Sequence, residues 1–416
     1  MPDQILNIVI IGASHAGLSC AEKLRSGGYQ GQIVVLERDE GLPLQRPPLS
    51  KTYLKADLSE GEATFALRKI DWFDNFDIRF RPGIAVTGLD RHARQLTLSD
   101  GNTLSYGHLV LATGAKARPL PQLTDGADNL HVLRTATDAR RLRAGLSTMQ
   151  LDRMQAVVIG GGYIGLEAAA SLRHFGSTVH IVEMAPRLLA RVASPALSAY
   201  CADLHKQQGV HLHNGEAVDR VTLDVHGRIT SVHLADGTEM PCQLVLAGIG
   251  ILPVSDLAVS AGLQVDDGIV VDAAYTTSDV HISAIGDVAR APSINSFRVE
   301  SIHHAQYSGA VVAASLTGAD LPPREAWWFW SDQYDVKFQM AGLVPPEKNI
   351  TASITRFGRR EGSLSIWTYA GGKLTSVEAA NDSQAYIIGK KCLDAGRSPA
   401  PEELKNPDFV LKSLLG

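Results

Sequence analysis

A strand, a glycine-rich turn and a helix follow one another twice in this chain, and this repeat constrains the fold more than any other feature. In the second copy an apolar strand precedes the turn GGGYIG at residues 160–165. Such a turn needs one glycine for the tight bend, one for close approach of a pyrophosphate and one for packing of the helix on the strand. Gly160, Gly162 and Gly165 occupy these places, and Glu183 ends the next predicted strand. The pattern therefore predicts a dinucleotide site, with Glu183 on the adenosine ribose hydroxyls.

The first copy departs from this pattern at one position. An apolar strand is expected over residues 5–11, and the turn GASHAG keeps Gly12 and Gly17 but has Ser14 at the second glycine position. Glu37 ends the following strand, as Glu183 does in the second copy. A nicotinamide requires a redox partner, and a flavin is the economical one. We therefore expect FAD on the first unit and NAD on the second.

The residues after the second turn bear on the choice between NADH and NADPH. The negative charge of Glu183 would repel the 2′-phosphate of NADPH, which favours NADH. Arg187 lies four positions further on and could offset this repulsion. The strictness of the preference therefore stays open on the sequence alone.

Two such units and a change of composition near the C-terminus predict the domain organisation. The fold class is α/β, with two Rossmann-like dinucleotide-binding domains and a C-terminal α+β domain. We expect an FAD domain from residues 1–118 and 250–322, an NAD domain from 119–249, and a C-terminal domain over 323–416. Pro322-Pro323 marks the last boundary.

Shorter signals fill in the domains. The Asp-Gly pairs at 100–101 and 236–237 predict hairpins. Strands are expected over 350–354 and 364–369, and a helical tail after Asp382.

Charge and hydropathy exclude several classes of function. The net charge of −5 argues against a general nucleic-acid binder. No apolar run reaches the ~18–20 residues that span a bilayer, so no membrane partner is expected. The start Met1-Pro2-Asp3-Gln4 lacks the features of a signal peptide, which indicates a cytoplasmic protein.

The cysteines and histidines give no metal signature. The four cysteines are scattered and form no CxxC pair, which suits a reducing cytosol; they are Cys20, Cys201, Cys242 and Cys392. The pairs His303-His304 and His211 with His213 lack a further ligand at a recognisable spacing. Packed or exposed histidines are the expected alternative, and no metal site is predicted.

Five segments together give a specific resemblance that covers nearly the whole chain. They are RPPLSK at 46–51, LATG at 111–114, GGGYIGLE at 160–167, AIGD at 284–287 and WFWSDQ at 328–333. On these residues the chain resembles the FAD-containing, NADH-dependent ferredoxin reductases of bacterial oxygenase systems, of the putidaredoxin-reductase type, within the glutathione-reductase-like superfamily. Disulfide reductases of that superfamily carry a paired-cysteine motif where this chain has RPPLSK, so electrons must leave for an external acceptor.

The resemblance implies three catalytic residues. Lys51 would lie near the flavin N5 atom, paired with Glu167, because a cation there stabilises negative charge on reduced flavin. Trp330 would lie near the flavin on the acceptor side. The alternative for Lys51 and Glu167 is that both are surface charges. The alternative for Trp330 is ordinary core packing of an aromatic residue.

The cofactor contacts follow from the motifs and from the resemblance. Asp287 would bind a ribityl hydroxyl; Arg134 would contact FAD from a linker strand, with a surface charge as the alternative. Ala16, Val86 and Ile302 would contact FAD through main chain or packing. The full set of expected cofactor-binding residues is Gly12, Ser14, Ala16, Gly17, Glu37, Arg46, Lys51, Val86, Thr113, Gly114, Arg134, Asp287, Ile302, Gly160, Gly162, Tyr163, Ile164, Gly165, Glu183 and Gly250.

Two segments bear on the docking of a partner. Ser308-Gly309-Ala310 stands where relatives often carry Gln-Ala-Arg, and that arginine faces the ferredoxin in some members, so the docking surface is expected to differ. The run Arg140-Arg141-Leu142-Arg143 is expected to form a solvated helix face, which could steer an acidic ferredoxin.

The resemblance implies that hydride passes from NADH to FAD, and that single electrons pass on to a 2Fe–2S ferredoxin. That ferredoxin would supply a haem monooxygenase or a ring-hydroxylating dioxygenase. A close alternative is the same flavin chemistry with rubredoxin, a quinone, monodehydroascorbate or oxygen as acceptor. An alternative of another class is a non-catalytic flavoprotein resembling apoptosis-inducing factor.

Overall fold

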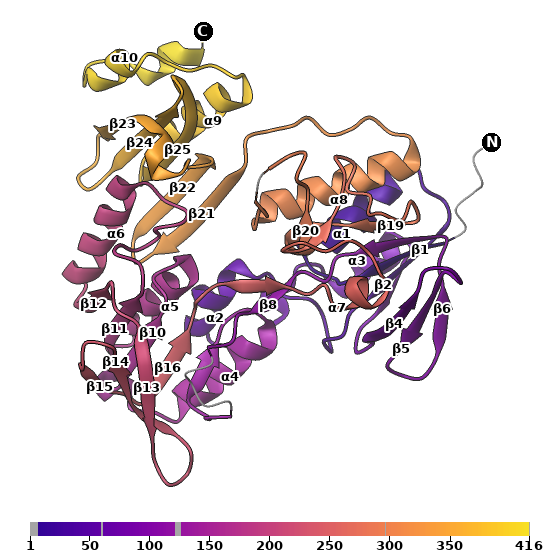
Figure 1. The fold of residues 1–416 in the computed structure, drawn as a ribbon, viewed down its shortest axis with the longest axis horizontal. Coiled ribbons are helices and arrows are strands. Elements are labelled where there is room, and N and C mark those ends of the chain that lie inside the picture. Colours follow the sequence, from indigo (N-terminus) through magenta and orange to yellow (C-terminus); the bar gives the residue numbers. More distant parts are fainter. Residues whose placement is uncertain (1–6, 60, 121–125, 296, 416) are drawn as a thin grey trace. The chain divides into compact units, whose positions relative to one another are not determined.

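The computed structural model describes residues 7–59, 61–120, 126–295 and 297–415 (Figure 1). Residues 5 and 6 of the first predicted strand, and the start Met1 to Gln4, lie outside the described residues. The chain divides into two compact units. Unit 1 comprises residues 1–46, 57–116 and 251–323, and unit 2 comprises residues 47–56, 117–250 and 324–416.

A parallel sheet of five strands forms the centre of unit 1. Its strand order is β19-β7-β1-β2-β3. The strands are β1 (Asn7–Ile11), β2 (Gln32–Leu36), β3 (Ile78–Arg81), β7 (His108–Leu111) and β19 (Ile282–Ala284). In the register, Ile8 lies opposite Ile33 on one side and His108 on the other. After their first residue, the central strands β1, β2 and β7 are entirely apolar, because the sheet is buried on both faces.

Two helices lie side by side in unit 1, α1 (His15–Ser26) and α8 (Ile302–Thr317) (Figure 1). They approach closely at Gly309, where an added Cβ would lie 2.8 Å from the Ala16 carbonyl oxygen and 3.0 Å from the Cys20 nitrogen. Ser308 and Gly309 are both buried. Ser308 and Gly309 therefore serve the packing of the two helices, and Ala310 is half-buried.

The remaining elements of unit 1 are short. An antiparallel sheet holds β4 (Val86–Asp90), β5 (Gln95–Leu98) and β6 (Thr103–Ser105), and the β5–β6 hairpin confirms the prediction made from Asp100-Gly101. The other short elements are η2 (Ala63–Phe65), α3 (Ile70–Asn75), α7 (Asp256–Ser260), β18 (Ile269–Val270), η4 (Gly286–Val288) and β20 (Ala289–Arg290). Strand β8 (Ala115–Ala117) pairs with β17 (Ile251–Pro253).

Unit 2 repeats the parallel architecture, with the strand order β12-β11-β10-β16-β9. The strands are β9 (Leu130–Val132), β10 (Gln155–Ile159), β11 (Thr178–Glu183), β12 (Val210–Asn214) and β16 (Leu244–Ala247). The helices are α4 (Ala136–Ser147), α5 (Tyr163–His174) and α6 (Pro195–Gln207), and α5 follows the second glycine turn. An antiparallel sheet of β13 (Val218–Leu223), β14 (Ile229–Leu234) and β15 (Glu239–Pro241) contains the hairpin predicted at Asp236-Gly237.

The C-terminal part of unit 2 is an antiparallel sheet with helices. Its order is β21-β22-β25-β24-β23, from β21 (Trp328–Gln333), β22 (Val336–Gly342), β23 (Ile350–Phe357), β24 (Leu364–Ala370) and β25 (Lys373–Ala380). The helical tail consists of α9 (Ser383–Asp394), α10 (Pro401–Lys405) and η6 (Leu411–Leu415). Unit 2 also holds η1 (Pro47–Ser50), α2 (Thr52–Lys55), η3 (Leu151–Arg153) and η5 (Glu347–Asn349). The predicted division into three domains stays a prediction.

Candidate functional site

The glycine turn of unit 1 joins β1 to α1. Gly12 has φ +108°, and a Cβ there would lie 2.3 Å from the Ala112 carbonyl oxygen. A Cβ on Gly17 would lie 2.0 Å from the Gly12 carbonyl oxygen. Ser14 has φ −92°, which any residue adopts, and its Oγ accepts a hydrogen bond from Arg46 Nε at 3.1 Å. The backbone therefore requires glycine at 12 and 17, and it accepts the serine between them.

Glu37 holds this turn from the end of β2. Its Oε2 accepts a hydrogen bond from the Ala13 N–H at 2.9 Å, and its Oε1 accepts one from the Asp39 N–H at 3.2 Å. The carboxylate thus connects the turn to the next strand, at the carboxyl ends of β1 and β2. Ligands of open parallel sheets bind at this edge.

Further predicted residues gather at the same edge of unit 1. Thr113 and Gly114 follow β7, and the Thr113 hydroxyl donates to the Val254 carbonyl oxygen at 2.6 Å. Asp287 follows β19 within η4, and Ile302 is the first residue of α8.

The packing between this loop and the helices is tight. A Cβ on Gly286, the residue before Asp287, would lie 2.8 Å from the Cβ of Ala16. The Gly286 N–H donates to Ser308 Oγ at 3.0 Å, so α8 fixes the loop that carries Asp287. Val86 begins β4, in the separate antiparallel sheet of unit 1.

Two predicted residues belong to unit 2. Arg134 lies between β9 and α4, and its backbone N–H donates to Asp138 Oδ2 at 3.1 Å. Gly250 has φ +102°, and its carbonyl oxygen accepts from the Arg118 N–H at 3.0 Å. Both residues belong to unit 2, and their contact with FAD stays a prediction.

The glycine turn of unit 2 joins β10 to α5. Gly160 has φ +107°, and a Cβ there would lie 2.4 Å from the Gly248 carbonyl oxygen. A Cβ on Gly165 would lie 2.1 Å from the Gly160 carbonyl oxygen. At Gly162, φ is −82°, and a Cβ would meet no described atom within 4 Å. Protein packing therefore requires glycine at 160 and 165, whereas the place beside Gly162 is open for a ligand.

Glu183 repeats the arrangement of Glu37. Its Oε2 accepts from the Gly161 N–H and its Oε1 from the Ala185 N–H, both at 2.7 Å. Arg187 turns to other partners, because its guanidinium donates to the carbonyl oxygens of Ala193 and Ala190 at 3.0 and 3.2 Å. The offset that Arg187 could have given to Glu183 is therefore weakened.

A buried carboxylate and a lysine meet between η1 and α5, as predicted for Lys51 and Glu167. Lys51 Nζ lies 3.2 Å from Glu167 Oε1 and 3.4 Å from Asp332 Oδ2. The side chains of Lys51 and Glu167 are only 12% and 4% exposed, which rules out the alternative of two surface charges. Ser50 Oγ donates to Glu167 Oε2 at 2.5 Å, and Ser331 Oγ donates to Oε1 at 2.6 Å.

Burial outweighs the groups that stabilise the charge of Glu167, so the pKa of its carboxyl lies above its usual value. Burial raises the pKa of the Glu167 carboxyl, and the Lys51 charge and the Ser331 and Ser50 hydrogen bonds lower it. Two hydroxyl donors and the Lys51 cation stabilise the ionised form of this buried carboxylate. The site therefore holds one cation in a fixed place at the end of η1.

Arg143 on α4 corrects the expectation of a solvated helix face. Its Nη1 donates to the carbonyl oxygens of Tyr53, Leu54 and Ala56 at 2.6, 3.1 and 2.9 Å, and its guanidinium lies 5.6 Å from the centre of the Tyr53 ring. Arg140 and Arg141 are exposed, as predicted. Arg143 instead holds the C-terminal end of α2, the helix that follows Lys51.

Aromatic residues lie on α5 and β21, the elements that carry Glu167 and Ser331. Tyr163, the first residue of α5, packs on Phe329 with 4.7 Å between ring centroids, and the next residue, Ile164, is 43% exposed. Trp330 on β21 is half-buried and lies 5.5 Å from Trp328, centroid to centroid. The place of Trp330 relative to a flavin stays a prediction.

The chain matches the profile of the pyridine nucleotide-disulphide oxidoreductase family over residues 6–309. It belongs to this family. Residues 328–415 match a second profile, that of the reductase C-terminal domain. The predicted fold class is thereby confirmed.

Several relatives of the chain are named as ferredoxin reductases. It is 37% identical to the rhodocoxin reductase of Rhodococcus erythropolis, over 98% of this chain and 94% of that protein. The ferredoxin reductase for the CYP199A2 system of Rhodopseudomonas palustris is 38% identical, with a TM-score of 0.92 over 99% of this chain and 100% of that one. The reductase in the covalent putidaredoxin reductase–putidaredoxin complex is 36% identical, with a TM-score of 0.91 over 98% of both chains.

Membership of the family implies FAD and NAD(H) as cofactors. The residues present fit both groups. Each glycine turn opens a helix of twelve residues, α1 or α5, whose first N–H groups can meet a pyrophosphate. The open place at Gly162 leaves room for a pyrophosphate close to the backbone.

The cysteines set this member apart from the disulfide chemistry in the family's name. Cys20, Cys201, Cys242 and Cys392 are all buried and unbonded. Burial raises the pKa of the Cys20 and Cys242 thiols to about 12. Such thiols are inert, so they offer no exit for electrons.

Of the histidines singled out in the sequence, His211 is exposed, His213 and His303 are half-buried and His304 is buried. His180 stacks on His211 at 4.7 Å, and His180 Nδ1 lies 3.1 Å from His213 Nε2. Within the described residues, no group of three histidine, cysteine or acidic side chains is arranged to hold a metal ion. No helix of the described chain is both long and apolar enough to cross a bilayer.

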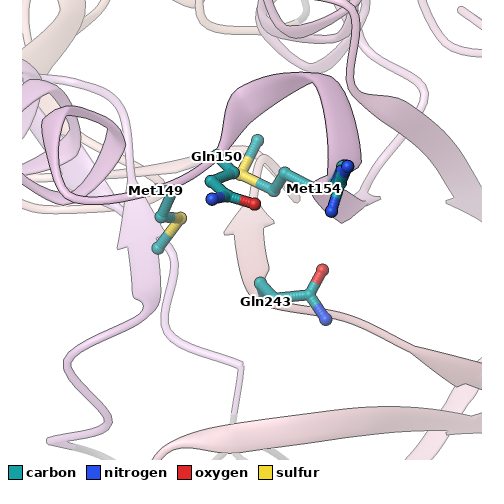
Figure 2. Close-up of a pocket in the computed structure, with 5 residues that line it drawn as sticks. Met149, Gln150, Met154 and Gln243 are labelled. Carbon is teal, nitrogen blue, oxygen red and sulfur yellow. The ribbon is translucent and has the colours of Figure 1, made fainter.

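A shallow pocket lies at the opposite edge of the unit 2 sheet (Figure 2). It is lined by Met149, Gln150, Arg153, Met154 and Gln243. Met154 immediately precedes β10, and Gln243 immediately precedes β16. The pocket therefore lies at the amino ends of the strands, whereas dinucleotides bind at the carboxyl ends.

Sequence reasoning missed several residues around Glu167. Ser50 lies in RPPLSK, and Ser331 and Gln333 lie in WFWSDQ, so the quoted motifs contained them without a role. His205, which lies 2.9 Å from Gln333 Oε1, has no motif of its own. Its partners are distant in the chain, and only the fold reveals it.

Proposed function

We propose that the protein is an NADH-dependent ferredoxin reductase. Electrons pass from NADH to FAD, and then one at a time to a 2Fe–2S ferredoxin that supplies a haem monooxygenase or a ring-hydroxylating dioxygenase. The observation that carries the proposal is the pair of glycine turns held by Glu37 and Glu183, in a chain without paired cysteines. Relatives of full length that are named as reductases of rhodocoxin and putidaredoxin support it.

The proposed site residues divide between the two glycine turns, one for each cofactor. Gly12, Ser14, Gly17 and Glu37 hold FAD, together with the residues after β7 and β19. Gly160, Gly162, Gly165 and Glu183 hold NADH. Ala16, Arg46, Val86, Arg134, Ile302, Tyr163, Ile164 and Gly250 complete the proposed contacts.

Lys51 and Glu167 form the proposed catalytic pair. Bound FAD supplies the conversion of one hydride equivalent into two single electrons. Lys51 offers a positive charge where negative charge develops on the reduced cofactor, and Glu167 holds that charge in place. Trp330 is proposed to lie on the acceptor side. For each NADH oxidised, two ferredoxins are reduced and one proton is released.

The remaining proposals concern organisation and setting. The chain is divided into an FAD domain, an inserted NAD domain and a C-terminal domain, with the boundaries given above. The ferredoxin docks transiently, assisted by charge. Four reduced, buried cysteines support residence in the cytoplasm.

Cytochrome c reduction by NADH, with and without an added 2Fe–2S ferredoxin, tests the proposal. We expect turnover that depends on the ferredoxin, after a visible spectrum with flavin bands. Comparable turnover without ferredoxin would favour a quinone, oxygen or another direct acceptor. Flavin reduction far below ~1 s⁻¹, against the usual range of ~1–10³ s⁻¹ for kcat, would favour a binding protein.

A further inference from the structure

A line of side-chain hydrogen bonds runs from Glu167 into the interior of unit 2. Ser331 Oγ lies 2.6 Å from Glu167 Oε1, and Gln333 Nε2 lies 3.2 Å from Ser331 Oγ. His205 Nε2 lies 2.9 Å from Gln333 Oε1, and the Tyr334 hydroxyl lies 3.0 Å from His205 Nδ1. Side chains from α5, α6, β21 and the β21–β22 turn thus form one continuous chain.

The inner members of this hydrogen-bonded chain have no access to water. Ser331, Gln333 and His205 are 0% exposed, and Glu167 is 3% exposed. Ser331 and Gln333 are two positions apart on β21, so they lie on the same face of the strand. Burying such polar groups is costly unless each has a partner, and here each partner is the next member.

The strand end that carries Tyr334 is constrained. Tyr334 has φ 55°, the left-handed region that a bulky residue rarely adopts. Its ring packs edge-on against the His205 imidazole at 5.1 Å between centroids. Backbone strain held at one residue points to a role for the side chain that it places.

The chemistry of the groups fixes the direction of every hydrogen bond. An ionised Glu167 only accepts, so Ser331 donates its hydrogen to it and accepts from the Gln333 amide N–H. The Gln333 oxygen then accepts from the His205 Nε2–H, and His205 Nδ1 accepts from the Tyr334 hydroxyl. Burial lowers the pKa of His205 to about 4, so the neutral ring that this arrangement needs is present at pH 7.

We propose that Tyr334, His205, Gln333 and Ser331 are positioning residues that act as one polarised chain, which keeps the Glu167 carboxylate ionised and fixed against Lys51. All four donors point toward Glu167, and aligned hydrogen bonds strengthen one another. The inference rests on the proposed function in one respect, the role of the Lys51–Glu167 pair in flavin reduction.

Other charged and titratable groups among the described residues also face this chain. Lys51 contacts Glu167 and Asp332. Burial raises the pKa of the Tyr163 hydroxyl, and the nearby Glu378, Cys201 and Glu167 raise it further. At the far end, burial raises the pKa of the Tyr334 hydroxyl, and the Arg173 charge opposes this shift. A proton on Glu167 would add a donor at the end toward which the chain points, while Ser331 Oγ, with two lone pairs, can still accept from Gln333. The tautomer of His205 therefore reports the direction of the hydrogen bonds in this chain.

The first test observes that tautomer in the FAD-loaded enzyme without NADH. With ring-¹⁵N-labelled histidine, NMR at neutral pH should show His205 protonated at Nε2 and bare at Nδ1, with the signal assigned by its loss in His205→Asn. Gln333→Glu places an anion beside the ring and should make His205 cationic. A His205 protonated at Nδ1 in the wild type, or cationic at neutral pH, would overturn the proposal.

The second test follows the acid limb of the pH profile for flavin reduction by NADH. Ser331→Ala removes a hydrogen bond to the Glu167 carboxylate, so the limb should move up by roughly one pH unit. Gln333→Leu should move it in the same direction by less. Ser198→Ala is the control, since it removes a buried hydroxyl on α6 that donates to the Leu188 carbonyl oxygen at 2.7 Å, outside the chain.

The outcomes separate the two proposals. If Ser331→Ala and Gln333→Leu fold, bind FAD and keep the wild-type acid limb, the polarised chain is wrong while the proposed function stands. If NADH fails to reduce the flavin of the wild-type protein, the proposed function is wrong, and the NMR measurement still decides the state of His205.

Discussion

Glu183 accepts a hydrogen bond from the backbone N–H of Gly161 at 2.7 Å, so the residue expected on the ribose also shapes the glycine turn. Glu183→Gln keeps an acceptor for this N–H and removes the charge. We expect the KM for NADPH, relative to that for NADH, to fall on the order of tenfold, equivalent to ~1.4 kcal/mol. Arg187→Ala should leave the ratio unchanged, because this guanidinium is bonded to Ala190 and Ala193. Loss of NADPH activity in Arg187→Ala would contradict this assignment.

Two glycines of one turn should respond differently to alanine. Gly165→Ala places a Cβ 2.1 Å from a carbonyl oxygen, so it should lower the thermal midpoint or prevent folding. Gly162→Ala meets no described atom, so the midpoint should be unchanged while the Kd for NADH rises roughly tenfold or more. Calorimetry and a binding titration on both variants check this pair. If Gly162→Ala binds NADH with wild-type affinity, the pyrophosphate does not bind beside Gly162.

The charge at Lys51 should matter for flavin reduction and little for folding. Lys51→Met and Glu167→Gln should slow the reduction of bound FAD by NADH on the order of 10²-fold, the usual loss for one preorganised electrostatic contact. Lys55→Met, at the exposed end of α2, is the matched control and should reduce normally. Stopped-flow absorbance of the flavin gives these rates. Equal rates in Lys51→Met and Lys55→Met would exclude Lys51 from the reaction.

Arg143 should stabilise the segment that carries Lys51. Arg143→Ala removes the donor to the carbonyl oxygens of Tyr53, Leu54 and Ala56. We expect faster amide hydrogen exchange over residues 52–56 and slower flavin reduction. Arg141→Ala, exposed on the same helix, serves as the control. Unchanged exchange in Arg143→Ala would show that these contacts do not hold α2 in place.

Glu378 on β25 should make stability depend on pH. It is 0% exposed, and burial raises its pKa to about 7, although Ser194 and Arg187 oppose the shift. The folded protein therefore binds this proton more tightly than the unfolded chain. Its contribution is complete below about pH 4.5 and is lost as the pH rises to about 7.

The Glu378→Gln variant isolates that contribution. Across this pH window its free energy of unfolding should rise relative to the wild type by up to about 3 kcal/mol. Thermal midpoints of both proteins at a series of pH values measure the difference. Parallel pH curves for the two proteins would show that Glu378 does not titrate in this range.

The sequence predicted what local geometry determines. The glycines at 12, 17, 160 and 165 are required by their own turns, and Glu37 and Glu183 follow at a fixed place on the next strand. Serine at position 14, in place of the second glycine of the pattern, causes no backbone strain because φ there is −92°.

Contacts between distant segments could not be predicted in the same way. Arg143 looked like one charge in an arginine-rich helix, because nothing near it in sequence indicates the carbonyl oxygens of residues 53–56. The link from His205 to Gln333 joins a helix to a strand more than a hundred residues later. Such partners are determined by the packing of whole elements, so no motif in the sequence predicts them.

The most direct measurement is an anaerobic two-step experiment on the purified protein. One equivalent of NADH should bleach the flavin absorbance, and a 2Fe–2S ferredoxin should then restore it with two ferredoxins reduced per flavin. Absence of flavin, no bleaching by NADH, or reduced flavin that the ferredoxin leaves unchanged while a quinone or oxygen reoxidises it, would contradict the account.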